Sequence, residues 1–298
     1  MTDTDTDTDT NYEKHREAGE ILVEVREEAA DSVEPGVPLL EVAETAEERI
    51  RQLGGEPAFP VNISRNEEAA HATPSRDDET EFGDDMVNLD IGVHVDGWIA
   101  DSAVTVDMTG NTDLAEAPEK ALEAAIDVVE AGVSTAEIGR VIEETINDEG
   151  FNPVYNLTGH GLDEYEQHTS PSIPNHAVDQ GVTLDEGDVV AIEPFATDGT
   201  GRVNEKGSAE IYSLVEPDAR IRSNAARDLL STINDDYGTL PFAKRWLPPK
   251  RLDMTVSRLE RRDIVHSYPT LSEDEGCLVS QAEHTVVVEE DGCEVITR

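Results

Sequence analysis

The sequence has few basic residues, few cysteines and no long apolar run. Lys and Arg total 22 against 67 Asp and Glu, which gives a formal net charge of −45. This balance disfavours DNA and anionic membranes as the main partners. No stretch of about 18 apolar residues is present, so we expect no transmembrane helix. The N-terminus lacks the pattern of a secretory signal, and Cys277 and Cys293, which form no metal motif, suit a reducing cytoplasm.

The acidic excess has two possible explanations. Only five of the basic residues are Lys, and an acidic excess with few lysines is similar to the composition of halophile proteins, in which salt screens the repulsion. The alternative is a disordered acidic interaction protein. Because 37% of the residues are hydrophobic and fall in periodic segments, we favour a folded core with an acidic surface. Residues 1–10, which include "TDTDTDTDT", are predicted to form a disordered acidic tail.

The two halves of the chain resemble each other. Residues 34–60 and 130–156 align without gaps, and each segment predicts an amphipathic helix that ends near a glycine. A further helix is expected before each copy, near residues 13–30 and 117–130. This order predicts a fold of two pseudo-symmetric halves.

Polar positions recur in the same order in both halves. The motif "HATP" at His71 matches "HTSP" at His168, and two strand-like segments with one carboxylate each follow. In the first half these segments are "DMVNLD" and "DSAVTV", and in the second they are "DVVAIE" and "EHTVVV". Each half is therefore expected to bring one histidine and two acidic side chains to the pseudo-two-fold axis. The acidic residues are Asp90, Asp101, Glu193 and Glu283.

The segment "MVNLDIGVHVDGWIADSAVTV" predicts a β-hairpin with a two-residue turn at Asp96-Gly97. In that register Asp101 lies opposite Gly92, so Asp90 is its diagonal neighbour on the same face, with Cβ atoms roughly 7–8 Å apart. Two carboxylates at that separation could hold a cation between them. The alternative is a solvent-facing sheet with two ordinary surface aspartates.

Four carboxylates in one place require protons or cations to compensate their charge. Two divalent metal ions balance four negative charges, and oxygen-rich ligands suit Mn, Fe, Co or Zn. Two such ions, about 3.5–4 Å apart, lower the pKa of a water held between them. His160, in the glycine-flanked loop "TGHG", is a candidate fifth ligand.

With these residues in place, the chain resembles the methionine aminopeptidases of pita-bread fold, in particular the archaeal and eukaryotic type II branch. The segments that carry the resemblance are "LDIGVHVDGWIAD", "GHG", "AIEPF", "QAEHT", "AAHATP" and "HTSP". The resemblance implies an α+β pita-bread fold with pseudo-two-fold symmetry. It also implies removal of the N-terminal methionine from nascent proteins whose second residue is small, by a cytoplasmic enzyme that we expect to be a monomer.

The resemblance also implies roles for individual residues. Two divalent metal ions (Co, Mn, Fe or Zn) would be held by Asp90, Asp101, His160, Glu193 and Glu283. Glu193 would also act as general base, His168 would stabilise the tetrahedral intermediate and His71 would position the scissile amide. Phe59 and Tyr268 match positions of the methionine pocket. His94 shares the face of the metal ligands but lies near the turn, so we expect it to be exposed.

Residues 213–271 are predicted to form an inserted, helical, winged-helix-like subdomain, with helices near residues 224–234 and 250–263. The catalytic domain would then comprise residues 11–212 and 272–298. "PFAKRWL" and "SYPTL" fit the type II branch of the family. Between Arg220 and Arg262 there are eight Arg and two Lys against five acidic residues. These basic side chains could contact ribosomal RNA, or they could simply pair with the acidic body.

Two other functions share this fold. Prolidases and aminopeptidase P use the same five ligands, but they carry a long N-terminal domain, whereas only 70 residues precede His71 here. A non-catalytic pita-bread binding protein is the second alternative. Such proteins lose metal ligands, and this chain keeps all five.

Overall fold

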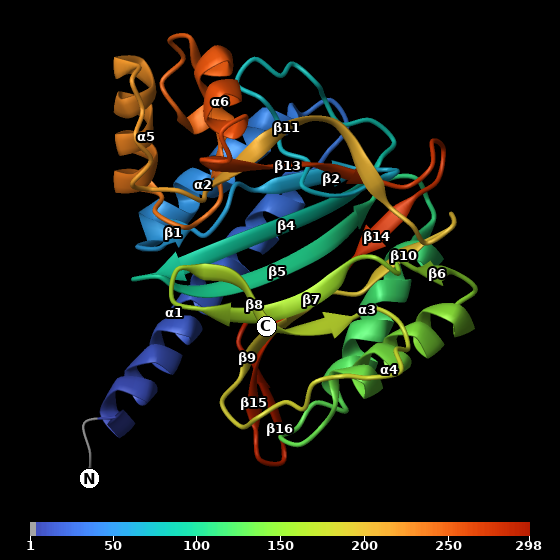
Figure 1. Ribbon diagram of the computed structural model, residues 1–298. Coiled ribbons are helices and arrows are strands. Elements are labelled where there is room, and N and C mark those ends of the chain that lie inside the picture. Colours follow the sequence, from blue (N-terminus) through green and yellow to red (C-terminus); the bar gives the residue numbers. More distant parts are fainter. Residues whose placement is uncertain (1–3) are drawn as a thin grey trace.

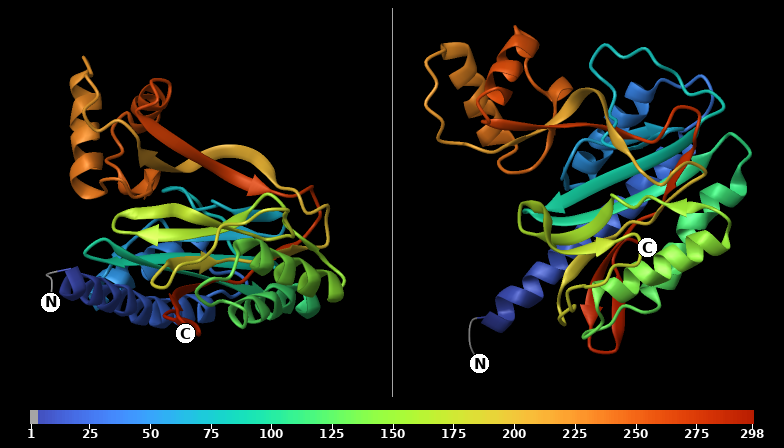
Figure 2. Two further views of the ribbon diagram at one scale, coloured as in Figure 1. Left: turned by 60° about the horizontal axis from the view of Figure 1, so that its bottom comes forward. Right: turned by 45° about the vertical axis from the view of Figure 1, so that its right-hand side comes forward.

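The computed structural model describes residues 4–298 and has two similar halves with an inserted segment above them (Figure 1). Helices α1 to α4 cover one side of the strands, and the inserted helices lie on the other side (Figure 2). The helices are α1 (Thr4–Asp31), α2 (Leu39–Leu53), α3 (Thr112–Ile126), α4 (Thr135–Asp148), α5 (Asn224–Asp236) and α6 (Leu252–Glu260). Within the described residues, no helix is both long and apolar enough to cross a bilayer.

The first half contributes β1 (Glu56–Pro57), β2 (Asn62–Arg65), β3 (Glu68–Ala70), β4 (Met86–Val95) and β5 (Trp98–Asp107). The second half contributes β6 (Asn152–Pro153), β7 (Thr158–Asp163), β8 (Glu166–Pro174), β9 (Val189–Ile192), β10 (Phe195–Thr197), β14 (Val279–Gln281), β15 (His284–Glu289) and β16 (Gly292–Val295). The remaining elements belong to the insertion or its base: β11 (Asn204–Leu214), β12 (Phe242–Ala243), β13 (Val265–Ser272) and the 3-10 helix η1 (Lys244–Trp246).

Each half packs a helix pair against its own strands. The helix α2 buries Val42 and Ile50 in a core with the strand residue Leu89. Its counterpart α4 buries Ile142 in a second core with Ile192. Both helices carry the apolar stripe that the repeat predicts, and α2 ends at Gly54, whose φ of 98° favours glycine. The predicted repeat architecture is confirmed.

The predicted acidic tail differs from the structure. Of residues 1–10, residues 1–3 lie outside the described residues, and α1 already begins at Thr4 rather than near residue 13.

The hairpin of β4 and β5 has the predicted register. Val95 pairs with Trp98, Gly92 with Asp101 and Asp90 with Ala103. The turn fixes this register because Asp96 and Gly97 both adopt the positive φ angles, 50° and 94°, that a tight two-residue turn requires.

The corresponding strand pair of the second half is interrupted. The first strand divides into β9 and β10 around Glu193 and Pro194, and the second into β14 and β15 around Ala282 and Glu283. The flanking pairs, Ile192 with His284 and Phe195 with Gln281, place Glu193 directly opposite Glu283. Proline cannot donate to a sheet ladder, so Pro194 accounts for the break in the strand that carries Glu193.

The insertion has its own hydrophobic core, which includes Leu230, Phe242 and Leu259. Both predicted helices are present as α5 and α6. The predicted boundaries, 213 and 271, fall inside β11 and β13, because this strand pair begins in the body and extends into the insertion. Strand β13 also pairs with β3, which joins the insertion to the segment that leads to His71.

Candidate metal centre

All nine predicted site residues line one cavity of about 390 Å³ between the two halves. The carboxylates come from β4, β5 and the two strand interruptions, whereas the histidines come from β7, β8 and the residue after β3. The residues are Phe59, His71, Asp90, Asp101, His160, His168, Glu193, Tyr268 and Glu283.

The acidic side chains and His160 form a compact, buried group. One potential ligand atom from each of Asp101, His160 and Glu283 lies within 4.8 Å of the other two. The Nε2 atom of His160 is 3.9 Å from Oδ2 of Asp101 and 3.7 Å from Oε1 of Glu193. Asp101 and Glu283 are each only 2% exposed. The surface-aspartate alternative is therefore wrong for Asp101.

The carboxylates are electrostatically uncompensated by the protein. Burial raises the pKa of Asp90 to about 7. Burial and the charges of the neighbouring carboxylates raise the pKa values of Asp101, Glu193 and Glu283 well above the usual range. One buried oxygen on each of Asp90, Asp101 and Glu283 has no hydrogen-bond partner among the described residues. Buried acceptors without donors fit bound cations, so the residues present suit divalent metal.

His160 is prepared to act as a neutral ligand. Burial lowers the pKa of its imidazole to about 3. Its Nδ1 lies 3.2 Å from the carbonyl of Gly161, so Nδ1–H donates there and Nε2 keeps its lone pair for the cluster. His160 lies in strand β7 and not in the predicted loop. A Cβ on Gly159 would meet the carbonyl oxygen of Ala191 at 2.3 Å, so this glycine permits the close strand packing.

Hydrogen bonds between the two halves hold the segments that carry Asp101 and Glu283 together. Ser102 donates through its hydroxyl to the carbonyl of Glu283 at 2.6 Å, and the N–H of Glu283 donates to Ala103 at 3.1 Å. Behind them, Arg26 of α1 donates to the Ser102 hydroxyl and to the carbonyl of Thr297. The acidic strands are therefore positioned by contacts to α1 and to the segment around Thr297.

His71 and His168 lie on the wall of the cavity. The ring of His168 is 4.3 Å from that of His160, centroid to centroid. The ring of His71 contacts Tyr268 edge to face at 5.5 Å and hydrogen-bonds to the backbone of Pro269. Burial lowers the pKa of both histidines, to about 4 for His71, so both rings are neutral near pH 7. His168 can donate a hydrogen bond to a substrate without adding charge. The single N–H of the neutral His71 ring donates to the carbonyl of Pro269, so its other ring nitrogen can accept a hydrogen bond from a substrate.

The position of Phe59 in the cavity wall depends on a glycine in β4. A Cβ at Gly92 would lie 2.1 Å from Cε1 of the Phe59 ring. Gly92 therefore explains two features at once, since it faces Asp101 across the hairpin and leaves room for the aromatic wall.

Several residues of the site were not predicted. Asn62 pairs with Asp90 between β2 and β4, is 4% exposed, and its Oδ1 has no partner among the described residues. Gln167, in β8, lines the cavity and hydrogen-bonds the Asp101 side chain. A search for polar residues opposite the acidic positions could have found Asn62.

The predicted exposure of His94 is wrong, since His94 is half-buried and its Nδ1 accepts from the N–H of Gly97.

The fold and this carboxylate–histidine centre define a metallopeptidase. Residues 13–219 match metallopeptidase family M24, and the chain belongs to this family, which implies a divalent metal cofactor. The chain is 54% identical over 287 residues to a methionine aminopeptidase of Archaeoglobus fulgidus, covering 96% of this chain and 98% of that protein. It is 47% identical over 290 residues to a methionine aminopeptidase of Methanocaldococcus jannaschii, covering 96% and 98%.

A solved structure agrees with the fold. The crystal structure of the methionine aminopeptidase from Thermotoga maritima superposes with a TM-score of 0.71 at 24% identity and covers 97% of both chains. The predicted pita-bread fold and the resemblance to methionine aminopeptidases are both confirmed.

Proposed function

We propose that the protein removes the N-terminal methionine from nascent proteins by metal-dependent hydrolysis. The observation that carries this proposal is the buried acidic cluster with unpaired oxygens, which opens into the same cavity as two neutral histidines. The relatives named methionine aminopeptidase support the choice of substrate over that of a prolidase. Retention of every ligand-type residue argues against a purely non-catalytic binding role.

The metal ligands in this proposal are Asp90, Asp101, His160, Glu193 and Glu283, which would hold two divalent ions, Co, Mn, Fe or Zn. Bound there, the metals would lower the pKa of the attacking water and would polarise the scissile carbonyl. The protein contributes a buried setting, around Asp101, His160 and Glu283, in which such charges act strongly.

The remaining groups handle protons and the peptide. Glu193, whose pKa is raised by burial, would accept the proton of the attacking water. His168 would donate a hydrogen bond to the oxygen on which charge develops, and His71 would align the scissile amide. Phe59 and Tyr268 would form apolar walls for the methionine side chain.

We further propose a cytoplasmic location and a monomeric state. Processing of nascent chains is a task at the ribosome, which supports the cytoplasmic location. An organism that accumulates salt would suit the net charge of −45.

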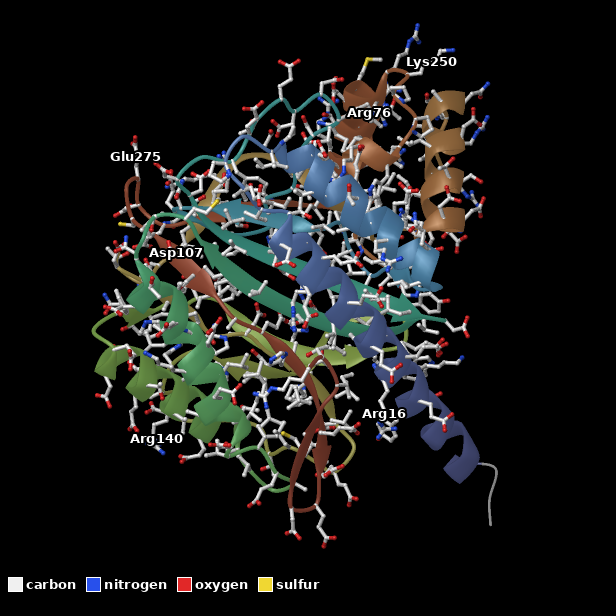
Figure 3. The ribbon with its side chains drawn as sticks, turned by 180° about the vertical axis from the view of Figure 1, so that it is seen from behind. Arg16, Arg76, Asp107, Arg140, Lys250 and Glu275 are labelled. Carbon is white, nitrogen blue, oxygen red and sulfur yellow. The ribbon has the colours of Figure 1, made fainter. Side chains whose placement is uncertain are left out.

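The insertion is proposed to contact ribosomal RNA. Of its ten basic residues, only Lys244 and Arg245 form ion pairs within the described part of the chain, the latter with Glu47 of the body. The other eight are exposed: Arg220, Arg222, Arg227, Lys250, Arg251, Arg258, Arg261 and Arg262. Pairing with the acidic body therefore does not account for them. Lys250 extends from the tip of the insertion in Figure 3.

Ribosome cosedimentation tests this contact. A triple variant, R258Q/R261Q/R262Q, should lose salt-dependent cosedimentation with ribosomes while its peptidase activity is kept. Arg140→Gln, which removes an exposed arginine paired with Glu137 and Glu144, is the matched control. Equal binding of the triple variant and the wild type would argue against an RNA contact by this surface.

A metal titration tests the proposed function itself. The chelated protein should be inactive, and about two equivalents of Co or Mn should restore cleavage of Met-Ala-Ser. Peptides that begin X-Pro, assayed in parallel, should be poor substrates. Preferential cleavage of the X-Pro peptides would identify a prolidase-like enzyme, and full activity without metal would refute the metal-dependent reaction.

A further inference from the structure

A buried ion pair joins the insertion to the catalytic body. Arg245, in η1, pairs through Nη2 with Oε1 of Glu47, on α2, and the two residues are 7% and 2% exposed. The other carboxylate oxygen of Glu47 accepts from the indole N–H of Trp246 at 2.8 Å. The N–H of Val61 donates to Oε1 of Glu47 at 3.3 Å, so the carboxylate also touches the chain just before β2.

The second arm of Arg245 reaches the segment that carries His71. Its Nη1 donates to the hydroxyl of Thr73 at 2.7 Å and to the carbonyl of Pro74 at 3.1 Å. The Thr73 hydroxyl donates in turn to the carbonyl of Val61 at 2.8 Å. Arg76, which lies against the inserted segment in Figure 3, donates to the carbonyls of Arg245 and Leu247.

His71 needs such support because its backbone is in an unfavourable region. Its φ is 63°, which non-glycine residues adopt rarely and only when their surroundings hold them. On one side of the segment the N–H of Ile63 donates to the carbonyl of Ala72 at 2.7 Å. On the other side Arg245 binds Thr73 and Pro74, the two residues after Ala72. The His71 ring itself meets Tyr268 and Pro269, which belong to strand β13 at the base of the insertion.

We propose that Arg245 is a positioning residue that holds His71 at the cavity and so makes the alignment of His71 depend on the docked insertion. This inference rests on the proposed function, in which His71 touches the scissile amide. A buried ion pair that served stability alone could be exchanged for apolar groups with little loss. Here the guanidinium also satisfies two oxygens beside a catalytic residue, which an apolar side chain cannot do.

The test removes both charges together, because removing one would leave the other buried and unpaired. In the metal-loaded protein, E47Q/R245M should keep its fold and metal content, while kcat/KM for Met-Ala-Ser should fall by about 10- to 100-fold, as expected for a small misplacement of an aligning group. In an H71A background the same pair of substitutions should cause almost no further loss, because the group being positioned is gone.

Two single variants keep the inference testable should E47Q/R245M fail to fold. Thr73→Val removes the hydroxyl that Arg245 binds and should reduce kcat/KM in the same direction, again only while His71 is present. Trp246→Phe removes a hydrogen bond to Glu47 without touching the His71 segment, so its activity should match the wild type.

The outcomes separate this inference from the proposed function. An active wild type whose T73V and E47Q/R245M variants keep full kcat/KM would overturn the positioning role alone. An equal loss in the wild-type and H71A backgrounds would also overturn it. A metal-loaded wild type that cleaves no Met-peptide would overturn both the inference and the function.

Discussion

The hydroxyl of Thr285 accepts a hydrogen bond from the backbone N–H of Asp101 and donates one to the backbone carbonyl of Asp101, each at 2.8 Å. One side chain of the second half thereby fixes both backbone groups of a proposed metal ligand from the first half. Partners of this kind orient metal ligands, so Thr285→Val should weaken metal binding by about 10- to 100-fold. Calorimetric titration with Mn is the measurement, and Thr285→Ser, which keeps the hydroxyl, should bind nearly as the wild type. Unchanged affinity in Thr285→Val would count against this role.

Asp101 and His168 should respond differently to substitution. Asp101→Asn removes a charge from the cluster, so metal content and rate should fall together. His168→Ala should keep its metals but lose about 10²–10³-fold in kcat, since it removes a donor to charge that develops in the transition state. Elemental analysis beside kcat on a Met-Ala peptide distinguishes the two. Loss of metal from His168→Ala, or normal metal content and rate in Asp101→Asn, would contradict these roles.

Gly92 should resist replacement although it lies in a strand. Gly92→Ala would push its Cβ into the Phe59 ring, costing about 1–3 kcal/mol of unfolding free energy and raising KM for Met-peptides. Gly83→Ala is the control, since the nearest atom to its Cβ would be Oδ2 of Asp85 at 3.8 Å. Thermal unfolding and steady-state kinetics measure both effects. A Gly92→Ala protein with wild-type stability and KM would show that Phe59 has room to move.

The metal-free protein should lose stability as pH rises. The folded-state pKa of Asp90 is raised to about 7, and the folded protein therefore binds more protons than the unfolded chain above the unfolded pKa. Its contribution is lost as pH rises through about 7, and the raised pKa values of Asp101, Glu193 and Glu283 act in the same direction. The lowered pKa values of His71 and His160 have the opposite effect, but only below about pH 6.5. There the unfolded chain binds more protons than the folded protein, so these two residues reduce stability as pH falls.

Unfolding midpoints of the chelated protein should consequently fall between about pH 6.5 and pH 8 in constant salt. Mn should raise the midpoint more at the higher pH, because binding to the ionised cluster no longer competes with protons. A chelated protein that becomes more stable over this interval would show that the carboxylates are compensated in some other way.

Low salt should inactivate the protein. With a net charge of −45, repulsion is screened at a Debye length of about 3 Å in molar salt but acts over about 30 Å at 10 mM. Side chains with oxygen tips project from the helices and loops around the periphery of Figure 3, in keeping with that charge. Circular dichroism and activity should be native in molar KCl and lost at about 10 mM, and native behaviour in both would refute the halophilic interpretation.

The sequence predicted features that follow from local rules. The Asp96-Gly97 turn determines the β4–β5 register, and the repeat then assigns Glu193 and Glu283 to the site. It did not predict that these two glutamates face each other, because the second strand pair has a different register from the first, in which Asp90 and Asp101 are diagonal neighbours. The two halves are therefore more alike in the order of their polar residues than in the hydrogen-bonding register of their strand pairs.

Contacts between distant side chains could not be predicted. Glu47 and Arg245 are 198 residues apart and no periodicity links them. Glu47 even occupies a buried position on a helix whose pattern would call for an apolar residue. Its burial becomes intelligible only when the insertion is folded onto α2 and supplies the guanidinium.

The hydroxyl of Thr297 accepts from the backbone N–H of Thr285 at 3.1 Å, which ties Thr297 to the residue that fixes Asp101. The centre thus combines groups that are far apart along the chain, such as Arg26, Asp90 and Thr297. No segment of the chain that stops short of residue 297 contains every group that holds Asp101 in place. Assembly of the centre therefore has to follow the docking of α1 and of the segment around Thr297 onto the two halves.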